Sequence, residues 1–252
     1  MAKERSGAGD PVRTLELLWR EPGQEPPGGR RGPRQGLTVD AVVTAAVALA
    51  DEEGSAALTM RALAQRLGVT PMTVYTYVPG KAELLDLMLD EVYRHMDRRE
   101  PADQEPWRLK VTRVADDNRD LLGRHPWIAD LAATRPPLGP GVIGKYEHEL
   151  AAFDGIGLTD AEMDAALTHL LGFVHANALA AADVAEHQRH QSDDEWWAVV
   201  GPLLERAMVP GKYPLAGRVG AAVGAFDPEA VWAFGLRCVL DGLAHRIGAD
   251  AP

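Results

Sequence analysis

One eight-residue segment concentrates side chains that can recognise the edges of nucleic-acid bases. It reads TPMTVYTY, begins at Thr70, and contains no charged residue. Its hydroxyl groups donate and accept hydrogen bonds, and its methionine side chain and tyrosine rings add apolar contacts. In the major groove of DNA, such groups distinguish one base pair from another. The candidate contact residues are Thr70, Pro71, Met72, Thr73, Tyr75 and Tyr77.

The residues around this segment predict two short helices joined by a tight turn, over residues 58–81. Thr59 is placed to cap the first helix, and Gly68 to end it. Thr70 followed by Pro71 is a cap with proline at the first helical position, which starts the second helix. This arrangement is a helix-turn-helix, whose second helix enters the major groove. The alternative is a helical corner that serves packing only, but tyrosines two positions apart cannot both be buried on one face of a short helix.

The rest of the chain predicts an all-α protein with two domains. Residues 1–36 contain twelve Gly or Pro residues and are expected to be a disordered or partly docked extension, with Leu15 to Trp19 as the docking patch. Residues 37–93 form the expected helix-turn-helix domain, and residues 94–252 a larger helical domain with no convincing strand. Thr159 and Glu162 form a capping box at the start of a long helix. The stretch from Met208 to Phe226 is expected to be a loop.

The charge of the chain is unevenly distributed. The whole chain has a net charge of −11, but residues 28–81 hold six basic and four acidic side chains, whereas residues 82–252 hold 16 basic and 28 acidic ones. This contrast favours a small DNA-binding unit on an acidic body, although ordinary surface variation produces similar contrasts. No apolar run of membrane-spanning length and no signal peptide are recognised, so a cytoplasmic protein without a membrane partner is expected. The lone Cys238 excludes an intrachain disulfide and is expected to be a small buried apolar residue.

Residues 37–93 resemble the DNA-binding domain of the tetracycline-repressor family of bacterial regulators. The resemblance rests on LTMRALAQRLGV from Leu58, followed by TVYTYVPGK from Thr73 and by Leu84-Leu85. It extends more weakly into the body, where LAATRP from Leu131 and the closing FGL and LDGL segments are similar to the C-terminal domain of that family. It implies a transcriptional repressor, not an enzyme, that a small-molecule effector releases from a palindromic double-stranded operator.

The resemblance also implies roles for individual residues. Arg61 would reach a guanine or the nearby backbone, the residues from Thr70 to Tyr77 named above would face the major groove, and Lys81 would contact a phosphate. Arg30, Arg31 and Arg34 either form an arm that touches DNA or belong to a solvated tail.

A homodimer is expected, because two helix-turn-helix domains are needed to read the two halves of a palindromic operator. By the resemblance, the helices at about 159–186 and 228–247 pair with their copies in a four-helix bundle. One apolar stripe on the last helix is a candidate for this interface or for the monomer core: Trp232, Leu236, Val239, Leu243 and Ile247. A second stripe, Gly172, Ala176 and Ala180, would allow close approach.

The body is expected to hold a mostly apolar effector cavity. Its candidate lining residues are Trp107, Leu121, Trp127, Leu131, Thr134, Phe173, His175 and Asn177. By alignment, the tetracycline repressors carry a magnesium-binding histidine where Leu131 stands and an acidic residue near Ala181. Both positions are apolar here, which disfavours a magnesium–tetracycline effector.

Other chemistry has weaker support in the sequence. Gly139 to Gly144 match a dinucleotide-binding glycine pattern but lack the preceding strand. His187 and His190 have suitable types for metal binding but stand in a polar stretch with no complete ligand set. No metal and no cofactor are therefore expected. The competing hypothesis is a small-molecule-binding helical protein or enzyme whose N-terminal helices only pack.

Overall fold

The computed structural model describes residues 7–21, 37–98, 105–131, 136–208, 211–223 and 227–249. These residues form helices and connecting turns, without any strand among them, which confirms the all-α prediction. The helices are α1 (Pro11–Leu18), α2 (Val39–Glu53), α3 (Met60–Arg66), α4 (Pro71–Tyr77), α5 (Lys81–Arg94), α6 (Trp107–Arg124), η1 (Pro126–Ile128), α7 (Pro140–Leu150), α8 (Asp160–His190), α9 (Asp193–Ala207), α10 (Pro214–Val223) and α11 (Pro228–Ala249).

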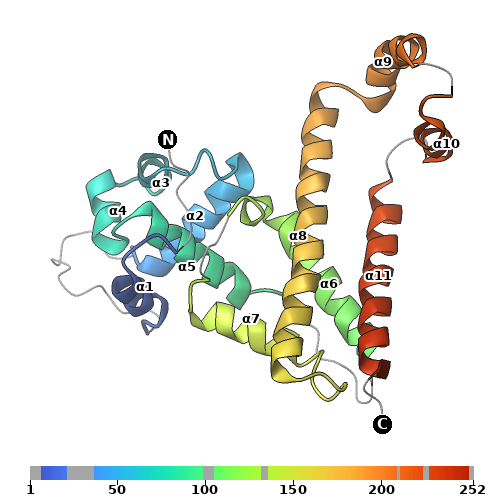
Figure 1. The fold of residues 1–252 in the computed structure, drawn as a ribbon. Coiled ribbons are helices and arrows are strands. Elements are labelled where there is room, and N and C mark those ends of the chain that lie inside the picture. Colours follow the sequence, from blue (N-terminus) through green and yellow to red (C-terminus); the bar gives the residue numbers. More distant parts are fainter. Residues whose placement is uncertain are drawn as a thin grey trace.

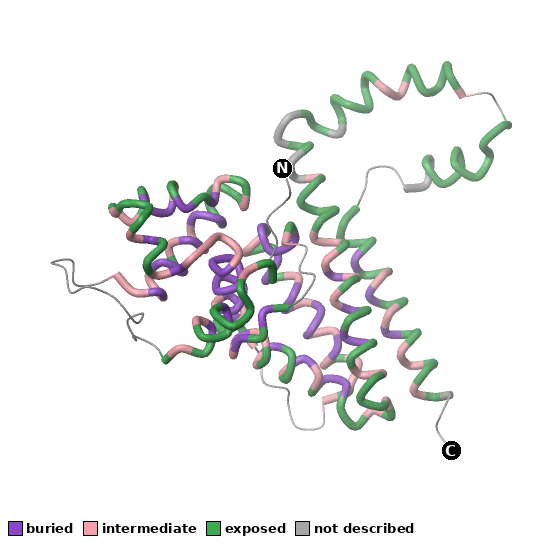
Figure 2. Tube along the Cα trace, turned by 60° about the vertical axis from the view of Figure 1, so that its left-hand side comes forward, coloured by how far each residue is buried: buried purple, intermediate pink, exposed green. Residues whose placement is uncertain are grey.

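Helices α1 to α5 form one end of the molecule, and α6, α7, α8 and α11 form the other (Figure 1). We call α2, α3 and α4 the head and the second group the body. Helix α5 contacts α2 in the head and α7 in the body, so it joins the two. The buried residues form one continuous core through head and body (Figure 2).

Helices α8 and α11 lie side by side along the body, and α9 and α10 project beyond one end of them (Figure 1). The capping box at the start of α8 is confirmed, because the Glu162 carboxylate accepts hydrogen bonds from the backbone N–H and the hydroxyl of Thr159, at 2.9 and 2.8 Å. Helix α10 lies in a segment expected to be a loop. Its glycines obscured the helical pattern in the sequence.

The stripe on α11 that begins at Trp232 belongs to the monomer core. Trp232 and Leu236 are buried, and the Trp232 ring lies 5.2 Å from the Phe173 ring of α8. The opposite side of α11 is exposed and includes Phe234. Cys238 is also exposed, so its expected burial is wrong. The periodicity of the helix marked an apolar face correctly but could not say which neighbour covers it.

Helix α8 carries more apolar surface than its own chain covers. Within residues 160–184, an 18-residue window has a mean hydropathy of 1.3, so this helix is long and apolar enough to cross a membrane by length and composition alone, which corrects the expectation that no such segment exists. Only 22% of this window is buried. Among the described residues it contacts α6, α7 and α11, as a body helix of a globular protein does.

Candidate nucleic-acid interface and effector cavity

Local capping interactions fix the two helices of the helix-turn-helix. The hydroxyl oxygen of Thr59 accepts the N–H of Ala62 at 3.0 Å, which caps α3. The hydroxyl oxygen of Thr70 accepts the N–H of Thr73 at 3.3 Å, which caps α4. Between them Gly68 has a φ of 65°, a conformation that glycine adopts without steric cost. The predicted turn and helix starts are therefore confirmed.

Buried side chains hold α4 against the rest of the head. Val74, in the middle of α4, is completely buried, as are Leu63 of α3 and Val78 directly after α4. The Arg66 guanidinium also donates to both carboxylate oxygens of Glu52, at 2.7 and 2.6 Å, and so ties the end of α3 to the end of α2. This hydrogen bonding raises the pKa of Arg66 and lowers that of Glu52. A short helix that could not persist alone is thus fixed by its neighbours.

The outer face of α4 is open to solvent. Met72 is 75% exposed and Tyr75 is 43% exposed, and Thr70 and Pro71 are also exposed. Thr73 and Tyr77 are half-buried, and Tyr77 packs partly against the core. Tyr77 is therefore less available for a base contact than the sequence suggested.

Two basic residues flank this face. Arg61 is exposed in the first turn of α3, two residues after the Thr59 cap. Lys81 is half-buried at the first position of α5, where Gly80 provides no side-chain cap. The backbone N–H groups of that first turn carry partial positive charge, which the carboxylate of Glu83 in the same turn partly offsets, so Lys81 supplies the positive charge that suits a phosphate here. Arg30, Arg31 and Arg34 lie outside the described residues.

The body contains a cavity of about 500 Å³ between α6, η1, α8 and α11. Most of its wall is apolar and includes Pro126, Ala129 and Val231, with a series of alanines from α8. The polar groups are the Arg119 guanidinium and the Asn177 amide. Arg119 donates to Glu229 at 3.0 Å and lies 4.6 Å from the Trp232 ring, so its charge is held at the cavity wall.

Of the residues predicted to line the cavity, only Asn177 is found there among the described part of the chain. Leu121 and Trp127 are buried in the core, Trp107 and Leu131 pack against it, and Phe173 stacks on Trp232. His175 is half-buried on α8, and Thr134 lies outside the described residues. The prediction selected large apolar residues, but those fill the core, whereas small alanines leave the cavity open. Arg119 was not among the predicted cavity residues, because the partner that holds it there, Glu229, is 110 residues away in the sequence.

A polar junction connects the head to the body. The Asp51 carboxylate, in the last turn of α2, accepts the indole N–H of Trp127 at 2.7 Å and lies 2.8 Å from the Nδ1 of His125. Trp127 is 2% exposed, so its N–H depends on this carboxylate. Asp51 of α2 therefore holds η1, which borders the cavity through Pro126.

Comparison with known proteins identifies two family matches along this chain. Residues 42–88 match the family described as bacterial regulatory proteins, tetR family. Residues 100–247 match the family described as tetracyclin repressor-like, C-terminal domain.

Three relatives illustrate the extent of the similarity. The HTH-type transcriptional repressor DrrR1 of Streptomyces coeruleorubidus is 40% identical over 99% of this chain and 93% of its own. The tetracycline repressor protein class A from transposon 1721 of Escherichia coli is 30% identical over 83% of this chain and 92% of its own. The crystal structure of ActR from Streptomyces coelicolor with actinorhodin superposes with a TM-score of 0.72 at 27% identity, covering 84% of this chain and 99% of ActR.

Proposed function

The chain belongs to the tetR family of bacterial regulatory proteins, and from this premise we propose how it acts as a ligand-responsive transcriptional repressor. The observation that carries the proposal is the pairing of a fully buried Val74 with an exposed Met72 and Tyr75 on α4. One side of the helix is anchored, and the other is free to enter the major groove.

In this proposal the contact residues divide by chemistry. Met72, Thr73 and Tyr75 meet base edges, and Tyr77 contributes through its exposed part. Thr70 and Pro71 bring the start of α4 close to the backbone, Arg61 reaches a guanine or a phosphate, and Lys81 binds a phosphate at the start of α5. Base contacts set specificity, and phosphate contacts set register and salt dependence.

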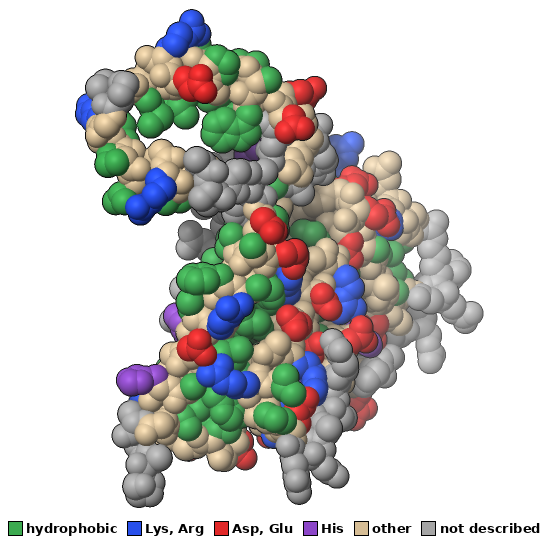
Figure 3. Space-filling model, turned by 90° about the vertical axis from the view of Figure 1, so that its right-hand side faces the viewer, with side chains coloured by type: hydrophobic (Ala, Val, Ile, Leu, Met, Phe, Trp, Pro, Cys, Tyr) green, Lys and Arg blue, Asp and Glu red, His purple; other side chains and the backbone are tan. Residues whose placement is uncertain are grey.

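The chain acts as a homodimer in this proposal, through the outer faces of α8 and α11. Hydrophobic side chains gather on the face that α11 presents, interspersed with charges (Figure 3). On α11 the exposed apolar residues include Phe234, and on α8 they include Leu179, two turns from the exposed Gly172 on the same face of the helix. A second copy would cover these residues and place two heads on one operator.

The cavity beside Arg119 is the proposed effector site. An apolar wall with one cation and one amide suits a flat, mostly apolar molecule that carries an acidic or carbonyl oxygen. The apolar Ala181 lines this cavity, and Leu131 packs against the core, so neither supplies a metal-binding group. ActR, which was solved with actinorhodin, provides a precedent for effector binding in this fold. A ligand that favours one spacing of the heads would release the operator.

We further propose that this regulator is cytoplasmic, has no enzymatic activity and requires no cofactor. The competing hypothesis, a helical enzyme or binding protein whose N-terminal helices only pack, gives α4 no reason to expose large apolar side chains to solvent. The exposure of Met72 and Tyr75 argues against it.

The test is selection of bound genomic fragments, followed by gel shifts on the DNA that flanks the gene. Wild-type protein should give a sequence-selective shift that weakens with salt. Tyr75→Ala and Lys81→Ala should weaken it while the thermal midpoint stays nearly unchanged. Tyr213→Ala is the matched control, because Tyr213 is similarly exposed but lies between α9 and α10, which project beyond the body. Wild-type protein that selects no fragment would contradict the proposal.

A further inference from the structure

Helix α1 lies outside both family matches, which cover residues 42–88 and 100–247. It packs on α5 beside the junction of α5 with α7 (Figure 1). Leu18, at its end, is 1% exposed and points into this junction, where a side chain added at Gly139 would approach within 2.8 Å of it. The opposite side of α1 is exposed and includes Val12. Helix α1 is therefore anchored by one face.

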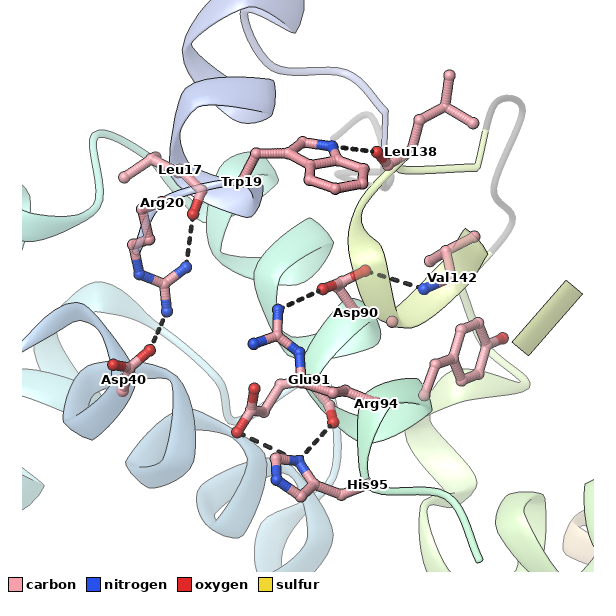
Figure 4. Close-up of polar contacts among 12 residues, drawn as sticks. Leu17, Trp19, Arg20, Asp40, Asp90, Glu91, Arg94, His95, Leu138 and Val142 are labelled. Atoms are coloured by element: carbon pink, nitrogen blue, oxygen red, sulfur yellow. Dashed lines mark hydrogen bonds and ion pairs between the residues drawn. The ribbon is translucent and has the colours of Figure 1, made fainter. Parts of the chain in front are cut away.

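Polar contacts from α1 and its flanks reach both the head and the body (Figure 4). On the body side, the indole N–H of Trp19 donates to the carbonyl oxygen of Leu138 at 2.8 Å. On the head side, Arg20 forms an ion pair with Asp40 of α2. A single turn of chain thus spans from the first turn of α2 to the loop before α7.

The start of the same segment is tied to α5. The N–H of Gly7 donates to the buried carboxylate of Asp86 at 2.9 Å, and the N–H of Asp10 donates to Glu83 at 3.2 Å. One turn further along α5, the carboxylate of Asp90 accepts the N–H of Val142 in α7 at 2.9 Å. One face of α5 therefore holds the N-terminal segment and α7 next to each other.

The junction that α1 covers is tightly packed. A side chain added at Gly141 of α7 would lie 1.9 Å from the backbone oxygen of Asp90, so the two helices are in direct backbone contact. Helix α5 begins at Lys81, next to the proposed DNA surface, and a small change at α7 would be transmitted along it to the head. A segment fastened to α2, α5 and the loop before α7 restrains that change.

We propose that α1 is a positioning strap, which fixes the orientation of the DNA-reading head relative to the effector body without touching DNA itself. The role rests on the proposed function, since a fixed orientation matters only if two heads must fit one operator. Leu18 and Trp19 are its positioning residues, and they act through α5 and α7. When the strap is loosened, the heads sample more orientations, and the fraction that fits the operator falls.

The test uses the full chain with Leu18→Ala and, separately, Trp19→Phe, which keeps the ring but removes the N–H donor to Leu138. Val12→Ala is the control on the same helix. Hydrogen exchange at the Val142 amide should become at least about tenfold faster in both strap variants and remain unchanged in the control. Affinity for the selected operator should fall about tenfold, with an unchanged slope against salt concentration, because no phosphate contact is lost.

Each alternative outcome has a definite meaning. An unchanged rate of hydrogen exchange at the Val142 amide in Trp19→Phe and Leu18→Ala would overturn the strap, whatever the operator affinity of these variants. Faster exchange with unchanged operator affinity would overturn its positioning role. If operator affinity depends less steeply on salt concentration in the strap variants than in the wild-type protein, α1 touches DNA, which also contradicts the proposal. If wild-type protein binds no operator, the proposed function fails, whereas the exchange experiment still decides whether α1 restrains α7.

Discussion

Replacement of Asp51 by alanine tests whether the polar junction stabilises the contact between head and body. The carboxylate accepts hydrogen bonds from Trp127, whose side chain is buried, and it lies beside His125. Loss of the acceptor leaves the Trp127 N–H without a partner, at a cost of about 1–3 kcal/mol. His125 is partly exposed, so water can replace its contact.

A smaller effect acts in the opposite direction. Asp51 lies in the last turn of α2, where the helix dipole disfavours a negative charge by about 0.3–1 kcal/mol. The expected net destabilisation by Asp51→Ala is therefore about 1–2 kcal/mol, which lowers the thermal midpoint by about 2–8 °C for a chain of this size. Glu53→Ala is the control, because it removes an exposed carboxylate from the same turn.

The assay is urea and thermal unfolding at one fixed protein concentration, since association changes apparent stability. Trp127→Phe removes the donor together with its need for a partner. The double variant, Asp51→Ala with Trp127→Phe, should therefore be more stable than the sum of the two single effects predicts, by about 1 kcal/mol or more. Additive effects, or an Asp51→Ala variant as stable as Glu53→Ala, would refute the reasoning.

Three further predictions follow from the body. In urea unfolding, Lys145→Met alone should destabilise the protein by about 3–5 kcal/mol, because it leaves the buried Glu149 without its ion-pair partner at 2.7 Å. The double variant, Lys145→Met with Glu149→Leu, should be nearly neutral because it removes both charges. Hydrogen bonds from Thr159, with a contribution from Arg246, lower the pKa of Glu162 to about 2 from 4.5. The ionised carboxylate therefore stabilises the fold fully above pH 4.5, and this stabilisation is lost as the pH falls towards 2. Glu162→Gln should flatten the curve of folding stability against pH in that range. Light scattering should give twice the monomer mass, and a monomer would contradict the two-head arrangement.

The sequence predicted the helix-turn-helix because its signals are local. A cap, a turn and a helix start depend on hydrogen bonds between residues no more than four positions apart. Thr59, Gly68 and Thr70 therefore revealed their roles without knowledge of the rest of the chain. The same holds for the capping box at Thr159.

Tertiary structure decided which apolar surfaces are covered and where space remains. Trp232 belongs to the core because Phe173 packs on it, and Cys238 is exposed because no helix of the chain covers that side of α11 among the described residues. Burial depends on neighbours that are distant in sequence, and a cavity arises where those neighbours are too small to meet. Periodicity along one helix contains neither piece of information, so the effector cavity and the contacts of α1 became visible only in the folded chain.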